Sequence, residues 1–116
     1  MIAYIKGELV ETLPGSVILD VHGIGYRIYI SGRESEQLTK MGSQVKLHTY
    51  FHVKEDAMQL YGFQHKDDLE VFSLLLGVSG IGPKAALGIL TAFSADDLRF
   101  AVLSEDAKTI AKAPEI

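Results

Sequence analysis

The sequence has no cysteine among its 116 residues. This absence excludes disulfide scaffolds, thiolate zinc sites and cysteine nucleophiles. The chain also lacks an apolar run near the roughly 18 residues that a membrane span needs. Its first residues, MIAYIK, have neither the basic nor the apolar region of a signal peptide. We therefore expect a cytoplasmic protein of one ordinary domain or two very small ones.

Positive charge is also scarce. The chain has 11 Lys and Arg against 15 Asp and Glu, a formal net charge of −4. Non-specific affinity for nucleic acid comes from Lys and Arg that displace counterions from phosphates. This composition argues against a chain that simply coats nucleic acid. Any such contact must be local, and backbone amides must contribute to it as much as side-chain charge does.

The usual signs of catalysis are missing as well. The chain contains no Walker motif and no nucleophile–base pair, so we expect a non-catalytic protein without a cofactor. His48 and His52 share one face of a strand but lie about 13 Å apart at the rise of a strand. That separation is too long for a shared metal ion. His22 and His65 have no suitably spaced partner, so we assign no metal ligand.

The first 64 residues follow the two-residue period of β-strands. Residues 45–54 show it best, because apolar and polar side chains alternate over ten positions and predict one core face and one wet face. A turn is expected at 23–25, and the polar segment 34–40 predicts one or two helical turns. Five strands with a short helix after the third favour a small Greek-key barrel of the OB type, although an SH3-like barrel fits nearly as well. Beyond an N-terminal strand, the predicted strands cover residues 17–21, 26–30, 45–54 and 58–63.

After Phe63 the period becomes helical. Acidic residues near Asp67 begin a first helix, Pro83 begins a second, and Ser94 and Ser104 are good N-caps for two more. The last three helices are predicted at 83–92, 94–102 and 104–112. The chain thus divides into a barrel of residues 1–64 and a helical domain of residues 65–116. At that size a lone core is marginal, so the halves should stabilise each other or rely on oligomerisation.

The segment 79–84, SGIGPK, is the most informative part of the chain. Its two glycines are expected to permit positive φ and a close approach, and proline is favoured at the first position of a helix. The free amides at the positive end of the helix dipole then form a phosphate site. Ile81 should turn back to hold the two helices together. The residues predicted to contact a backbone phosphate here are Ser79, Gly80, Ile81, Gly82 and Lys84.

This order matches the helix-hairpin-helix motif, which grips a DNA backbone without reading bases. The alternative is a plain corner between two helices. A dinucleotide-binding fingerprint needs a preceding strand and a third glycine, and neither is present. Residues 110–116 echo the motif, and we expect a second hairpin of which they are only the first part. There Glu115 replaces the first glycine and adds a negative charge near the phosphate site.

Glu55 and Asp56 are predicted at the tip of a hairpin, with both carboxylates in solvent. They could be a solubilising turn. A metal nuclease site is a weaker interpretation, because no third carboxylate or histidine lies nearby in sequence. Lys54 beside them either contacts a phosphate or is a solvated lysine at a strand end.

Four segments occur in an order that resembles the RuvA family, bacterial subunits that recognise four-way Holliday junctions. They are MIAYIKG at 1–7, GIGY at 23–26, VKEDAMQLYGF at 53–63 and GIGPK at 80–84. The resemblance covers the whole chain. It implies an OB-fold domain I, most of a helix-hairpin-helix domain II, and a missing C-terminal domain that docks the RuvB ATPase.

The resemblance also implies roles and partners. Glu55 and Asp56 match the family's acidic pin, which lies at the centre of the junction and repels phosphates. The implied partners are Holliday junction DNA, RuvB, the RuvC resolvase and further copies of the chain in a homotetramer, or an octamer on DNA. The alternative is a helix-hairpin-helix fragment of a repair nuclease or glycosylase. Such an enzyme would carry an Asp or Lys just after the hairpin, where this chain has AALG at 85–88. A plain OB interaction module would not explain the hairpin.

Overall fold

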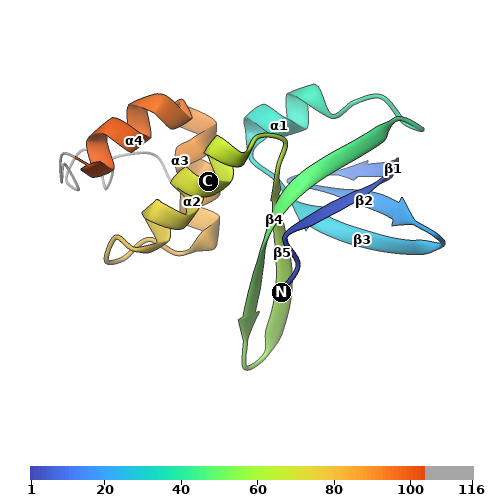
Figure 1. Ribbon diagram of the computed structural model, residues 1–116, viewed down its shortest axis with the longest axis horizontal. Coiled ribbons are helices and arrows are strands. Elements are labelled where there is room, and N and C mark those ends of the chain that lie inside the picture. Colours follow the sequence, from blue (N-terminus) through green and yellow to red (C-terminus); the bar gives the residue numbers. More distant parts are fainter. Residues whose placement is uncertain (104–116) are drawn as a thin grey trace.

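The computed structural model describes residues 1–103. Figure 1 shows the strands and α1 as one group, with α2, α3 and α4 together on the other side of β4 and β5. The predicted helix 104–112 and second hairpin 110–116 lie outside the described residues. In chain order the elements are β1 (Tyr4–Leu13), β2 (Ser16–Val21), β3 (Ile24–Tyr29), α1 (Gly32–Gln37), β4 (Gln44–Lys54), β5 (Ala57–Phe63), α2 (Lys66–Leu76), α3 (Pro83–Ala92) and α4 (Ala95–Leu103).

The strands form a closed barrel in the order β1-β2-β3-β5-β4. Only the β3–β5 pair that closes it is parallel. β1 is long because its first half pairs with β4 and its second half with β2. A register shift between Leu9 and Glu11 lets it bend between these partners. This order confirms the OB-type barrel and sets aside the SH3-like alternative.

The turn between β2 and β3 lies one residue earlier than predicted. It consists of His22 and Gly23, whose φ angles are 51° and 90°. The carboxylate of Asp20 accepts a hydrogen bond from the Gly23 amide at 3.0 Å. A two-residue hairpin favours positive φ at both central positions, because that twist matches the strands. Ile24 and Gly25, predicted in the turn, are the first residues of β3.

The predicted alternation of β4 is right only in part. Leu47 and Thr49 are buried in the barrel, while Lys46 is exposed. On the supposedly wet face Tyr50 is half-buried, because it packs against Phe72 of α2. Val53, predicted on the core face, is 59% exposed. Figure 1 shows why: the β4–β5 hairpin extends beyond the rest of the barrel.

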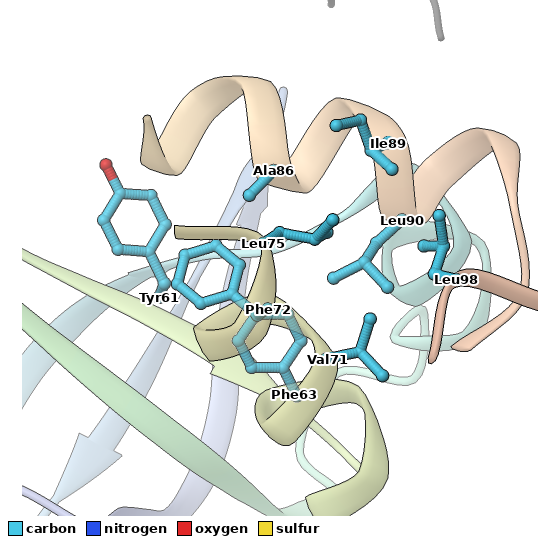
Figure 2. Close-up of a cluster of buried hydrophobic side chains, with 9 residues drawn as sticks. All are labelled: Tyr61, Phe63, Val71, Phe72, Leu75, Ala86, Ile89, Leu90 and Leu98. Atoms are coloured by element: carbon cyan, nitrogen blue, oxygen red, sulfur yellow. The ribbon is translucent and has the colours of Figure 1, made fainter. Parts of the chain in front are cut away.

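β5 contributes to two hydrophobic cores. Leu60 packs inside the barrel, and a side chain at Gly62 would also point inward, within 2.5 Å of a methyl of Ile28. Tyr61 and Phe63 point the other way, into the helices. Figure 2 shows them in one cluster with side chains of α2, α3 and α4. The two small halves of the chain therefore stabilise each other through one shared strand.

The centre of this second cluster is Phe72 of α2, which is fully buried. Its ring centroid lies 5.0 Å from that of Phe63, 5.4 Å from Tyr50 and 5.5 Å from Tyr61. Aromatic pairs at such distances add to the stabilisation that burial provides. The helical group is thus packed firmly against the barrel.

α1 covers Gly32–Gln37 rather than the predicted segment 34–40, because Ser31 is its N-cap. The helices after Phe63 match their predicted positions closely. α3 covers the predicted range 83–92, and α4 begins one residue after Ser94. The Ser94 hydroxyl accepts a hydrogen bond from the Asp97 amide at 3.2 Å, which confirms the predicted N-cap. Over residues 1–103, no helix is both long enough and apolar enough to cross a membrane.

Candidate nucleic-acid interface

The turn between α2 and α3 is short and defined by its own backbone. α2 ends at Leu76, and the amide of its C-cap, Gly77, donates to the carbonyls of Leu74 and Leu75. The Ile81 amide then donates to the Val78 carbonyl at 3.1 Å and closes the turn. Gly80 lies inside this turn with a φ of +88°, a left-handed conformation that L side chains resist. The positive φ predicted for this glycine is confirmed.

Gly82 behaves differently from the prediction. It is the N-cap of α3, with a φ of −94° and a ψ of 178°. Any residue can adopt this extended backbone, so positive φ is not the reason for a glycine here. An added Cβ would meet no atom within 4 Å. What the missing side chain leaves open is the space in front of the first turn of α3.

The first turn of α3 presents amides without intrahelical partners. Pro83 is its first residue, as predicted, and lacks an N–H. The amides of Lys84 and Ala85 lie where an α-helix leaves its donors unpaired, and the Gly82 N-cap has no side chain to accept from them. The positive end of the helix dipole adds to this site. The geometry therefore suits an anion.

The side chains around the turn divide into two groups. Ser79, Gly80, Gly82 and Lys84 are exposed, so the candidate site is open to solvent. Ile81 is half-buried and packs against the second core, which confirms that it holds α2 and α3 together. A role for Ile81 at the DNA backbone would therefore involve its backbone rather than its side chain.

The tip of the β4–β5 hairpin is a second exposed feature. Glu55 and Asp56 form its two-residue turn, because Lys54 pairs with Ala57 at the end of the ladder. All three charged residues of the tip are exposed, as predicted. Figure 1 shows the tip and the α2–α3 turn as separate projections from one body. Structural proximity thus groups Lys54 with the carboxylates rather than with Lys84.

The histidines do not form a metal site within the part of the chain that the structure describes. No group of three His, Asp or Glu side chains there is arranged to hold an ion. His48 lies near positive charge: burial lowers its pKa, and Lys46 and Lys66 lower it further.

The junction of the two halves contains a buried acid that the sequence prediction missed. Glu34 of α1 is only 4% exposed. Its carboxylate accepts hydrogen bonds from the Gln64 amide at 3.0 Å and from the Gln64 side chain at 2.6 Å. Burial raises the pKa of Glu34, and these hydrogen bonds oppose part of that shift. A signal was present, because Ser31 and Glu34 have capping-box spacing and the Ser31 hydroxyl accepts from the Glu34 amide.

α1 is also bonded to α3. The Gly32 amide donates to the Thr91 hydroxyl at 2.8 Å, and the Arg33 Nε donates to the Thr91 carbonyl at 3.1 Å. These partners are 59 and 58 residues apart in sequence. No local pattern predicts such a contact. The barrel and the helices are thus joined by directional bonds as well as by apolar packing.

The barrel and the glycine turn together define an OB-fold protein with an appended helix-hairpin-helix domain. Comparison with protein families agrees: residues 1–62 match the RuvA N terminal domain, and residues 72–116 match a SAM-like helix-hairpin-helix tandem. The chain belongs to the RuvA family.

Curated relatives match along the whole chain. One from Lachnospira eligens is 53% identical over 116 residues, which is all of this chain and 56% of the relative. Relatives from Acetivibrio thermocellus and Caldanaerobacter subterraneus subsp. tengcongensis are each 42% identical over 116 residues, again all of this chain and 57% and 62% of the relative. Each is named Holliday junction branch migration complex subunit RuvA. The chain spans a little more than half the length of these relatives.

Proposed function

We propose that this chain is the DNA-binding part of a branch-migration subunit. It recognises four-way Holliday junctions by their shape and their phosphate backbone, with little preference for base sequence. The names of its relatives support the substrate. The observation that carries the proposal is the unusual N-terminus of α3.

Three helices of the chain differ in their first turns. α2 has Asp67 and Asp68 there, and α4 has Asp96 and Asp97, so acidic side chains already complement these two dipoles. The first turn of α3 has no acid and carries Lys84 instead. With unpaired amides, an uncovered dipole and one lysine, α3 is ready to bind an anion such as a backbone phosphate. Ser79, Gly80 and the backbone of Ile81 complete the proposed contact with Gly82.

The acidic tip has the opposite role in this proposal. Glu55 and Asp56 repel phosphates and keep DNA strands apart where the arms of a junction meet. Exposed carboxylates on a DNA-binding protein weaken binding to a plain duplex, and this penalty favours the open junction over the duplex. Lys54 offsets part of the repulsion by contacting a neighbouring phosphate.

Residues 1–64 serve as the barrel domain and residues 65–116 as the helix-hairpin-helix domain in this proposal. The chain has no catalytic step of its own. A homotetramer, or an octamer on DNA, matches four arms, and the RuvB ATPase supplies the motion. RuvC resolvase is a further partner, and the setting is the bacterial cytoplasm.

Binding titrations test the proposal directly. A four-way junction and a linear duplex of the same sequences are titrated at one salt concentration, and both are repeated with an unrelated sequence. We expect the junction to bind at least about tenfold tighter, since several arms are held at once. We expect little change between sequences, and no cleavage when Mg²⁺ is added. Equal affinity for junction and duplex in a multimeric sample would contradict the proposal.

A further inference from the structure

One stripe of α3 faces the barrel. Lys84, Leu87, Gly88 and Thr91 repeat at three- and four-residue spacing and line a common groove against α1. Lys84 lies at the N-terminal end of this stripe and Thr91 near its C-terminal end. Lys84, which adds positive charge to the candidate phosphate site, and Thr91, which bonds to α1, therefore share one face of one rigid helix.

The contact at Thr91 is both bonded and close. Its hydroxyl accepts from the Gly32 amide at 2.8 Å and donates to the Leu87 carbonyl at 2.9 Å, so the hydroxyl is held in one orientation. Arg33 binds the Thr91 carbonyl at 3.1 Å. A Cβ at Gly32 would lie 2.6 Å from the Thr91 methyl, a distance that requires something to shift. The absence of a side chain at Gly32 thus allows α1 to touch α3.

α1 is itself fixed from its other side. The Glu34 carboxylate binds the amide and side chain of Gln64, in the connection between β5 and α2. The same Gln64 side chain donates to Gln37 at 2.6 Å. α1 therefore bonds to α3 and to the connection before α2. Hydrogen bonds weaken steeply when their angles are poor, so these bonds add an orientational constraint to the close-packed core.

We propose that Gly32, Arg33 and Thr91 are positioning residues, which set the angle of α3 against the barrel. They thereby fix the phosphate-binding turn relative to the acidic tip. This inference rests on the proposed function, because the angle matters only if both features engage one junction. A helix moves as a rigid rod with a rise of about 1.5 Å per residue, so a shift at Thr91 is transmitted to the amides about 10 Å away.

The test uses one substitution that introduces a steric clash and a second substitution that relieves it. Gly32→Ala introduces the clash with the Thr91 methyl. Adding Thr91→Ser removes that methyl and keeps the hydroxyl, and the next nearest Thr91 atom is then 3.4 Å from the new Cβ, an ordinary contact. Thr91→Ser alone is the matched control. Thr91→Ala is a second, milder perturbation, which removes the acceptor without adding an atom.

The first readout is a distance between the barrel and α3, which changes when the angle of α3 changes. The chain has no cysteine, so spin labels attached at Thr12→Cys on β1 and Lys84→Cys on α3 report one distance. Double electron–electron resonance is measured in samples diluted with unlabelled protein, so that only distances within one chain contribute. We expect Gly32→Ala to shift or broaden the distance distribution, and we expect Gly32→Ala/Thr91→Ser to restore it.

The second readout is the ratio of junction affinity to duplex affinity in chains without labels. We expect Gly32→Ala to lower this ratio by at least about tenfold, because misaligned sites cannot engage together. Duplex affinity should change little, and the double variant should recover the ratio. A role in stability alone predicts a lower melting temperature with an unchanged ratio, and that result would overturn the inference. So would an unchanged distance in Gly32→Ala and Thr91→Ala. If the original chain shows no junction preference, the proposed function fails, while the distances still decide whether the contact sets the angle.

Discussion

Gly82→Ala separates DNA binding from folding at the α2–α3 turn. Its φ of −94° suits alanine, and the new Cβ meets no atom within 4 Å. Alanine restricts the unfolded chain and so stabilises the protein by about 0.4–1 kcal/mol. It is also a poorer N-cap than glycine, by roughly 0.5 kcal/mol. The two effects nearly cancel, so the free energy of unfolding should change by less than about 0.5 kcal/mol.

DNA binding should respond strongly to the same change. The Cβ occupies the open space in front of the α3 amides, where the phosphate is expected. A hydrogen bond to a charged group contributes about 1.5–3 kcal/mol. Loss of one such bond weakens binding roughly 10- to 150-fold at 1.4 kcal/mol per factor of ten.

Gly80→Ala is the matched comparison. It adds the same atom, also in open space, but at a φ of +88°. The left-handed backbone penalty is about 1–2 kcal/mol, so this variant should lose stability where Gly82→Ala does not. Urea unfolding and junction titrations measure both quantities. Junction binding of Gly82→Ala at the original affinity would refute the phosphate site at this turn.

Three further changes test other parts of the site. Lys84→Glu should weaken junction binding at least about tenfold and reduce the salt dependence of binding by about one phosphate contact. Lys40→Glu makes the same charge change on the barrel side and should bind the junction normally. Equal losses of affinity in the two variants would point to net charge alone. Glu55→Gln with Asp56→Asn should leave junction affinity unchanged or higher and raise duplex affinity more, so the preference for the junction over the duplex should fall. Loss of junction binding in a folded multimer would contradict the proposed repulsion of phosphates by these two carboxylates. Burial raises the pKa of Glu34, so its stabilising contribution is complete below pH about 4.5 and is lost as the pH rises through the raised pKa. Glu34→Gln should remove that part of the pH dependence of the free energy of unfolding in urea. An unchanged pH profile would refute the raised pKa of Glu34.

Local patterns predicted the elements that local physics decides. Pro83 marked the start of α3, and Ser94 marked the cap of α4, because each acts on the backbone beside it. The wet face of β4 was predicted wrongly at Tyr50, which packs against Phe72 of α2. Nothing within a strand reveals what packs on it later in the chain.

The two glycines of the turn show a second limit. The SGIGPK segment predicted positive φ at both, and only Gly80 has it. Gly82 is extended, so its importance lies in the space it leaves open rather than in its backbone. The contact of Gly32 with Thr91 was missed for another reason. It joins residues 59 positions apart, and only the packed fold brings them together.

Hydroxyl-radical footprinting of a four-way junction tests the central claim most directly. The four arms are given unrelated sequences, so that any sequence preference becomes visible. The account predicts backbone protection on all four arms beside the crossover, with little protection of a duplex at the same protein concentration. Protection that follows one arm's sequence, or that spreads evenly along every arm, would contradict recognition of the junction by its shape.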